Sequence, residues 1–325
     1  MKKIDIFNHV LPLRYYEELR KAGMDLPLGN VVLLKDMAAR AAEVAEHEDL
    51  HQLLTLVAPE DIDKPDIAVG SRLAAVANDT IAEIVAERPD TFPAGIGTVN
   101  LRDMDGALAE LRRCVEQLGF RGVQIATTCA GEDLSEEKFL PFFEAMAGYD
   151  LPVLLHPCNG PHSKPDFIFN WPLETTWMMI NLSTSSLFSR LPGLKIVTHH
   201  LGAMVPTFHN RIFTTYLREG FFQSGQSQTD AETAYANLKR FYCDTALYGD
   251  CTAAIEAGLA FFGLEHVLFG TDYPLDGDRG ANGRGQTANT IASIERLSLS
   301  ESEKAAVFSQ NAVRLFRLGA ACAGA

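Results

Sequence analysis

The chain of 325 residues is 47 % hydrophobic and 22 % charged, a composition typical of a globular protein with a large core. Its formal net charge of −14 argues against nucleic acid or an anionic membrane surface as a partner, because so acidic a surface repels phosphate. No run approaches the roughly 18 consecutive apolar residues that would predict a membrane span.

The spacing of the cysteines and the first residues of the chain indicate the cellular compartment. The six cysteines are scattered, and none forms a Cys-x-x-Cys pair. This pattern favours reduced thiols over a disulfide framework or a zinc knuckle. The opening Met1-Lys-Lys-Ile-Asp is not followed by the apolar stretch of a signal peptide. We therefore expect a cytoplasmic protein.

Short apolar runs alternate with helical patterns along the chain. The runs expected to form strands are 3–10, 52–59, 92–99, 122–126, 152–156, 194–200, 240–246 and 266–271. The stretches expected to form helices are 15–22, 36–47, 71–87, about 103–118, 135–149, 171–190, two within 204–240, and one from Ser300 onward. Gly119 is expected to end the fourth helix, and Ser300 with Glu303 has the form of a capping box.

Eight apolar strands separated by helices predict the α/β class and a (β/α)8 TIM barrel. The alternative, a doubly wound open sheet, lacks a Gly-x-Gly-x-x-Gly fingerprint after the first strand. We expect one domain over residues 1–325, since barrels commonly reach this length. Residues 11–50 form an insertion after the first strand, which we interpret as a lid over the barrel mouth or as the contact of a homodimer.

Four of the expected strands end on a possible metal ligand or proton carrier. His9 ends the first strand, His156 the fifth, the pair His199-His200 the sixth, and Asp272 follows the eighth. In a parallel barrel these ends meet at one mouth, where such enzymes keep their chemistry. A lone histidine at a strand end is more often structural, so the joint placement carries the inference.

The directions of the two adjacent histidine side chains, His199 and His200, are expected to differ. Consecutive side chains of a strand point to opposite faces, so one ring is expected at the mouth and the other toward the helices. We expect His200, which precedes Leu-Gly, to be the inward one. Asp272 at the mouth needs a partner, either a metal or His200.

Several other polar residues carry weaker signals. Asp244, at the end of the seventh strand, has no supporting motif, and Glu174 suits the first turn of a helix. We expect Cys158 to line the pocket, because no nucleophilic triad is evident. Residues that could hold a substrate carboxylate, although any surface cation fits that description, are Arg72, Lys164 and Arg211.

Four ordered motifs resemble the amidohydrolase superfamily, in particular its branch with aminocarboxymuconate-semialdehyde decarboxylase and gamma-resorcylate decarboxylase. They are Ile4-Asp-Ile-Phe-Asn-His-Val-Leu-Pro12, Leu154-Leu-His-Pro157, Lys195-Ile-Val-Thr-His-His-Leu-Gly-Ala203 and Leu268-Phe-Gly-Thr-Asp-Tyr-Pro274. The resemblance implies one divalent metal, zinc or manganese, bound by His9, His156 and Asp272. It also implies a proton-transfer role for His200.

The first strand departs from the family pattern. Family members commonly open with His-x-His, or with glutamate in place of the first histidine, whereas this chain has Phe7 there. An apolar ring thus stands where a ligand would be, on the same strand face as His9. Three ligands remain, which is the number that an open catalytic site needs.

Three functions are consistent with this sequence. The first is a decarboxylase of a small unsaturated or aromatic carboxylic acid, in which His200 protonates the carbon that loses carbon dioxide and Asp272 binds the metal and holds His200. The second is a hydrolase in which the metal activates water against an amide, lactone or ring carbonyl. The third, motivated by Phe7, is a barrel without metal that binds a ligand or acts as a scaffold.

Overall fold

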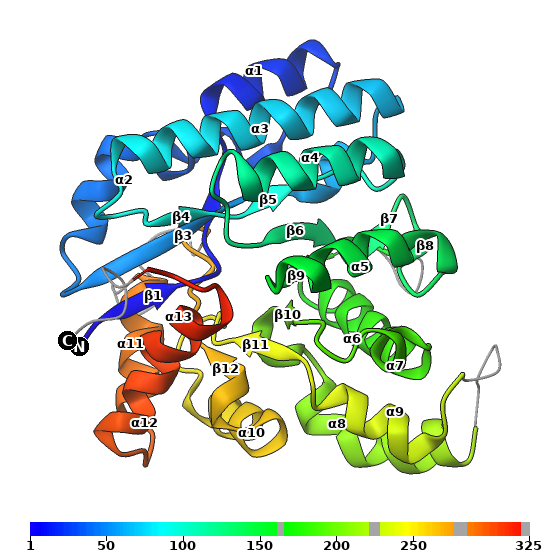
Figure 1. Cartoon of the computed structure of the whole chain (residues 1–325). Coiled ribbons are helices and arrows are strands. Elements are labelled where there is room, and N and C mark those ends of the chain that lie inside the picture. Colours follow the sequence, from blue (N-terminus) through cyan, green and yellow to red (C-terminus); the bar gives the residue numbers. More distant parts are fainter. Residues whose placement is uncertain (161–165, 221–227, 276–284, 320–325) are drawn as a thin grey trace.

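The computed structural model describes residues 1–160, 166–220, 228–275 and 285–319. Its central feature is a ring of parallel strands that are surrounded by helices (Figure 1). The strand segments, in order around the ring, are β1 (Lys3–Asp5) with β2 (His9–Val10), β3 (Leu50–Leu56), β4 (Ala94–Gly95) with β5 (Gly97–Thr98), β6 (Val123–Ala126), β9 (Val153–His156), β10 (Ile196–Thr198), β11 (Tyr242–Asp244) and β12 (Val267–Leu268).

Backbone hydrogen bonds connect neighbouring strands and close the ring. All the pairs between these segments are parallel, from β1–β3 through to β11–β12. Beyond β12 the chain returns to the first strand, where Ile6 N donates to Phe269 O at 3.0 Å and Asp272 N donates to Phe7 O at 2.8 Å. The predicted (β/α)8 barrel is therefore confirmed, and all its strand ends share one mouth.

Helices cover the outside of the strands (Figure 1). After the first two strands they are α3 (Ile67–Glu87), α4 (Met104–Glu116), α5 (Leu140–Tyr149), α6 (Asn170–Thr184), α7 (Leu187–Arg190), α8 (Val205–Arg211) with a π-helical continuation (Ile212–Arg218), α9 (Ala231–Leu238), α10 (Thr252–Phe262), α11 (Gln286–Glu295), α12 (Glu301–Ala305) and α13 (Asn311–Leu315). None of the helices in the described part of the chain is both long and apolar enough to cross a membrane.

Local sequence patterns predicted some helix ends correctly and others wrongly. Asp103 caps α4 by accepting from Gly106 N at 3.1 Å, and Ser300 with Glu303 forms the predicted capping box. Gly119 has a φ of +70°, as expected for a residue that ends a helix. The expected start at Ser71 is wrong, because α3 already begins at Ile67. The long helix expected over 171–190 is two helices, interrupted after Thr184.

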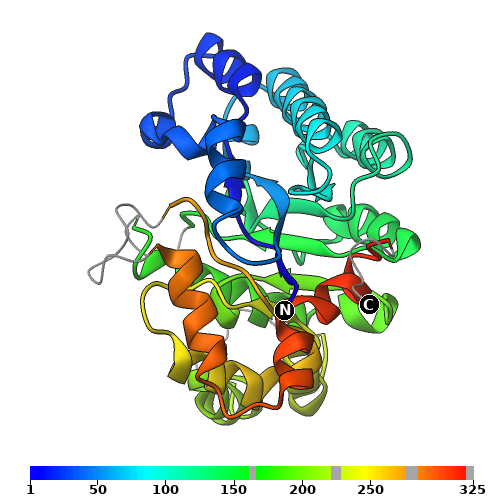
Figure 2. The same cartoon turned by 90° about the vertical axis from the view of Figure 1, so that its left-hand side faces the viewer.

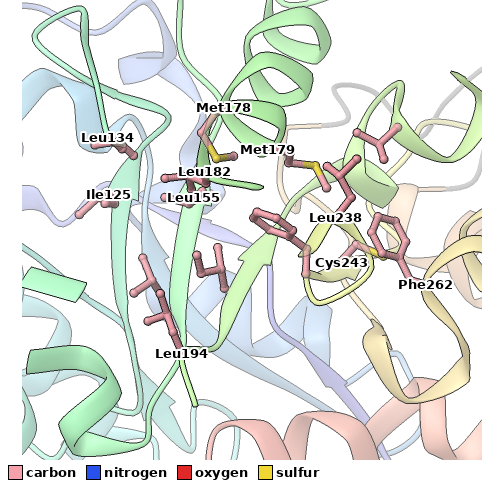
Figure 3. Packing of buried hydrophobic residues seen from close by; sticks show 14 of the residues in the cluster. Ile125, Leu134, Leu155, Met178, Met179, Leu182, Leu194, Leu238, Cys243 and Phe262 are labelled. Atoms are coloured by element: carbon pink, nitrogen blue, oxygen red, sulfur yellow. The ribbon is translucent and has the colours of Figure 1, made fainter. Parts of the chain in front are cut away.

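The core has an inner and an outer layer. Inside the barrel, the strands contribute Ile4, Ile6, Leu53, Leu154, Val197 and Leu268, and Leu315 and Phe316 pack beneath them. Outward side chains of the same strands meet the helices, since successive strand residues alternate in direction. Figure 3 shows this outer layer, in which Leu155 and Cys243 share one buried cluster with Leu182 of α6 and Phe262 of α10.

The insertion between the first and second strands contains α1 (Leu13–Lys21) and α2 (Met37–Val44). Figures 1 and 2 both show these helices on the opposite side of the molecule from α12. Arg40 of α2 is fully buried, and its guanidinium donates to Gln52 Oε1 at 2.9 Å, to Asn8 Oδ1 and to the carbonyl oxygen of His9. A buried cation on α2 therefore ties the insertion to the strand that delivers His9.

Candidate active site

Four imidazoles gather around one phenyl ring at the mouth of the barrel. The ring centroid of Phe7 lies 3.6 Å from that of His199, 4.6 Å from His9, 5.5 Å from His200 and 5.8 Å from His156. The residues come from the ends of three strands that lie far apart in the sequence. The structure thus brings together the histidines that the sequence singled out.

Asp272 has His9 as its partner. Its Oδ1 atom lies 2.9 Å from His9 Nε2, and its Oδ2 atom accepts from the Tyr248 hydroxyl at 3.4 Å. Burial alone would raise the pKa of Asp272, but the contact with His9 and the charges of His200 and His199 outweigh it, and the pKa is lowered. Asp272 is therefore kept as a carboxylate. The expectation that it holds His200 directly is not met, because the His200 ring is bonded elsewhere.

Both histidines of the sixth strand reach the mouth. His199 continues the inward direction of Val197, is fully buried and stacks on Phe7. His200 has a φ of 55°, which is outside the strand region, so its half-buried ring also turns toward Phe7. The expectation that the two rings face opposite sides is therefore wrong. Strand alternation ends at His200, where the chain enters a short helical turn.

Asp244 holds both of these histidines. Its Oδ2 atom is hydrogen-bonded to His199 Nδ1, and its Oδ1 atom accepts from the backbone N–H of His200 at 3.1 Å and of Ala246 at 3.0 Å. The Nδ1–H of His200 donates to Ala246 O at 2.6 Å. Burial raises the pKa of Asp244 to about 7, and burial beside other imidazoles depresses the pKa of His199 well below its usual range. The sequence placed Asp244 at a strand end but offered no motif to select it.

Glu60 is a residue that the sequence analysis missed. It follows Ala58 and Pro59 at the end of β3, where the φ of 62° at Ala58 turns the chain sharply. Its Oε2 atom lies 3.8 Å from His156 Nδ1. Burial raises the pKa of Glu60 to about 7 and holds the pKa of His156 well below its ordinary value. The available signal was an acidic residue directly after the second strand.

A cavity of about 330 Å³ opens beside Glu60. Within it, Lys64 is ion-paired with Asp61. Cys158 lines the cavity, as expected, and its Sγ atom lies 3.3 Å from Thr127 Oγ1. The lining residues are Glu60, Asp63, Lys64, Thr128, Ala130, Gly131, Cys158 and Asn159. None of the four histidines of the mouth is among these lining residues, so the cavity adjoins the site through Glu60, which contacts His156.

The mouth contains donor groups of the kind that a divalent metal uses. His9 Nε2, apart from its contact with Asp272, and His156 Nδ1 are buried without a hydrogen-bond partner. Neutral imidazoles beside a carboxylate are the ligands that zinc and manganese use. As they stand, no three His, Cys, Asp or Glu side chains among the described residues already surround one point. The donor chemistry fits a divalent metal, but Phe7 supplies no donor.

The remaining candidates lie outside this cluster. Arg72 and Arg211 are on the surface, where the Arg72 guanidinium is 3.8 Å from Glu18. Lys164 lies outside the described residues. Glu174 is buried in the first turns of α6, and its Oε1 atom accepts from Asn170 Nδ2 at 3.3 Å. Within the described part of the chain, neither Arg72 nor Arg211 forms a hydrogen bond or ion pair with the histidines of the mouth.

Comparison with known proteins gives a consistent picture. A gamma-resorcylate decarboxylase from Rhodococcus jostii is 29 % identical over 339 residues, covering 95 % of this chain and 92 % of the relative. A 2-amino-3-carboxymuconate-6-semialdehyde decarboxylase from Dictyostelium discoideum is 29 % identical over 213 residues, covering 62 % of this chain and 56 % of the relative.

Solved structures share the fold. The crystal structure of 5-carboxyvanillate decarboxylase from Sphingomonas paucimobilis superposes with a TM-score of 0.80 at 24 % identity and covers 98 % of this chain and 99 % of its own. A dihydroxybenzoic acid decarboxylase from Polaromonas, solved with bound manganese and an inhibitor, gives a TM-score of 0.81 at 24 % identity and covers 98 % and 97 %.

The amidohydrolase family model matches residues 34–318, which is most of the chain. The match includes His156, His200 and Asp272, and the barrel supplies His9 from its first strand. The relatives are decarboxylases, the reaction class that the sequence predicted. The chain belongs to the amidohydrolase family, as its strand-end motifs indicated.

Proposed function

We propose that this protein is a metal-dependent decarboxylase that releases carbon dioxide from a small aromatic or unsaturated carboxylic acid. The observation that carries the proposal is the gathering of His9, His156, His200 and Asp272 at one barrel mouth. The decarboxylases among its relatives, matched over 95 % of this chain in the gamma-resorcylate case, support the same reaction.

His9, His156 and Asp272 would hold one divalent metal, for which manganese and zinc are the candidates. His156 Nδ1 has no hydrogen-bond partner, His9 Nε2 contacts the Asp272 carboxylate, and the lowered pKa of Asp272 keeps that carboxylate available. When bound, a divalent metal draws charge from the substrate carboxylate and an adjacent oxygen. The dihydroxybenzoic acid decarboxylase with bound manganese supports this assignment.

His200 is the proton donor in this proposal. As the bond between the ring carbon and the carboxyl carbon breaks, its electron pair stays on the substrate carbon, which then takes a proton from His200 Nε2. The Nδ1–H bond to Ala246 O fixes the orientation of the ring, and Asp244 fixes the backbone of His200. Nε2 is thereby the nitrogen left to give the proton.

Asp272 acts through its charge as well as through the metal. Its carboxylate contacts His9, and it lies close enough to His200 for their charges to interact. Asp272 therefore places a negative charge near the His200 ring without bonding to it.

Replacing His200 with asparagine tests this mechanism. The substrates are the four acids that name the relatives, gamma-resorcylate, 6-methylsalicylate, 5-carboxyvanillate and 2-amino-3-carboxymuconate-6-semialdehyde. We expect wild-type protein loaded with manganese to release carbon dioxide from at least one acid, and His200→Asn to lose this activity at unchanged metal content. His47→Asn, on the insertion, is the control. Retained turnover in His200→Asn excludes its acid role, and ring opening of a lactone panel would support a hydrolase instead.

We further propose a homodimer in a reducing cytoplasm. The five cysteines among the described residues are free and buried, which is compatible with a reducing compartment. Exposed apolar side chains on the insertion, Leu13 and Val32, offer a surface for a second copy. Light scattering after size exclusion measures the mass, and a Leu13→Asp variant should shift it from dimer to monomer.

A further inference from the structure

Glu60 lies beside the strand that lacks its usual ligand. It sits in the turn after β3, and β3 pairs directly with both segments of the first strand, with His9 opposite Thr55. The turn at Ala58 and Pro59 brings the Glu60 carboxylate back toward the mouth, where it meets His156. A carboxylate from the second strand thus lies beside His156 at the mouth, where the side chain of Phe7 offers no donor.

The spacing between Glu60 and His156 fits two ligands of one ion. Glu60 Oε2 and His156 Nδ1 are 3.8 Å apart, which is too long for a hydrogen bond. Ligands that are each about 2.1 Å from a metal are at most about 4.2 Å from each other. Both atoms are buried and neither has a hydrogen-bond partner. Two buried donor atoms that face each other at this distance can both bind one ion.

The surrounding charge also favours a cation. The nearest ammonium, that of Lys64, is ion-paired with Asp61, and Asp63 lines the same cavity. The His156 side chain is only 4 % exposed, and that of Glu60 20 %. The buried Oε2 atom of Glu60 is stabilised by a positive partner, and a divalent ion is one that would satisfy both Glu60 and His156.

We propose that Glu60 is a ligand of the metal that His9, His156 and Asp272 hold, and that it replaces the first-strand ligand whose place Phe7 occupies. The inference rests on the proposed metal-dependent function. Glu60 adds a second carboxylate to that of Asp272, so the two negative charges balance a divalent ion. His9 with Asp272 forms one facing pair of donors and His156 with Glu60 forms the other.

The test measures manganese affinity directly on the full-length protein, by titration of metal-stripped samples with Mn²⁺ and detection of free Mn²⁺ by electron paramagnetic resonance. The variants are Glu60→Gln, Glu60→Asp and, as a matched control, Asp63→Asn, which loses the same charge in the same cavity. Circular dichroism and thermal melting establish that each variant is folded. Carbon dioxide release is recorded in parallel.

Loss of even an indirect partner of a metal ligand costs about tenfold or more in affinity, so Glu60→Gln should weaken Mn²⁺ binding by at least about tenfold. The affinity of Glu60→Asp should lie between those of wild type and Glu60→Gln, and Asp63→Asn, which removes a nearby charge but no ligand, should weaken binding much less than Glu60→Gln does. Equal affinities in Glu60→Gln and Asp63→Asn overturn the inference, even if the protein releases carbon dioxide. A wild type that binds no Mn²⁺ also overturns it. A third outcome is that Glu60→Gln loses Mn²⁺ while wild type decarboxylates none of the acids. This outcome would support Glu60 as a metal ligand and would reject the proposed reaction.

Discussion

The phenyl ring of Phe7 stacks on the imidazole of His199, with centroids 3.6 Å apart and an angle of 19° between the ring planes. This contact places an apolar ring among the imidazoles of the mouth, where His156 Nδ1 and His199 Nε2 have no hydrogen-bond partner. Phe7 therefore defines both the packing of the site and its missing donor.

Replacing Phe7 with histidine should strengthen metal binding. An imidazole can stack on His199 as the phenyl ring does, and it adds a nitrogen donor beside His9. We expect the Mn²⁺ affinity to rise by about tenfold, since removing a partner of a metal site costs a similar factor. The measurement is the same Mn²⁺ titration, with Phe7→Leu as the control because it removes the ring without adding a donor. Equal affinities in the two variants would show that position 7 does not face the metal.

The Asp244→Asn variant should lower the turnover number. The amide oxygen can still accept from the backbone N–H groups of His200 and Ala246, but the amide nitrogen cannot accept the proton of His199 Nδ1. Because His199 loses this acceptor, its ring takes another orientation or tautomer. We expect kcat to fall by about tenfold or more, with little change in KM. Asp250→Asn, which changes an exposed aspartate near α10, should leave kcat unchanged. An unchanged kcat in Asp244→Asn would show that the hydrogen bond between Asp244 and His199 does not contribute to turnover.

Asp5 should make stability depend on pH. This buried carboxyl accepts from Thr271 Oγ1 at 2.7 Å and from Gln52 Nε2 at 3.1 Å, and burial raises its pKa from 3.8 to about 7. Because the folded pKa is the higher one, the stabilising contribution of Asp5 is fully present below about pH 4 and is lost as the pH rises through about 7.

The test compares the free energy of unfolding of wild type and Asp5→Asn across this range. As the pH rises from about 4 to 7, the free energy of unfolding of wild type should fall relative to that of Asp5→Asn, by up to about 1.4 kcal/mol per pH unit. Urea unfolding at several pH values measures it, and the exposed Asp90→Asn is the control. A difference that is independent of pH would mean that Asp5 is already ionised at low pH in the folded protein.

Arg40 should be essential for stability. Its buried guanidinium bonds three different groups on the first two strands, so removing it leaves Asn8 Oδ1 and the His9 carbonyl oxygen unpaired. We expect Arg40→Met to reduce the free energy of unfolding by about 3 kcal/mol, the range for breaking a buried polar network. Arg14→Met, which removes an exposed ion pair with Glu83, should cost less than about 1 kcal/mol. Similar losses in both variants would contradict the anchoring role of Arg40.

The sequence predicted the barrel and the cluster of side chains at its mouth, because both depend on local patterns. Several apolar runs end at a residue that the parallel topology carries to the same mouth, so the proximity of His9, His156 and Asp272 could be predicted without coordinates. Their joint appearance in chain order also identified the family. The capping box at Ser300 was predicted for the same reason, since its signal lies within four residues.

The remainder depends on backbone angles and long-range contacts that no local pattern encodes. The positive φ at His200 turns its ring to the mouth, against the alternation expected of a strand. Glu60 reaches His156 only because Ala58 turns the chain. Arg40 meets His9 across 31 residues, and nothing in its own helix indicates the contact.

Removal of the metal tests whether an ion bound at this mouth supports decarboxylation. Protein stripped with a chelator is assayed for carbon dioxide release from the four acids, before and after one equivalent of Mn²⁺ is added back. We predict no release from stripped protein and restored release from at least one acid after reloading. Release that is equally fast without metal would show that the reaction does not need the ion. No release from any acid by protein that has bound Mn²⁺ would contradict the proposed decarboxylation.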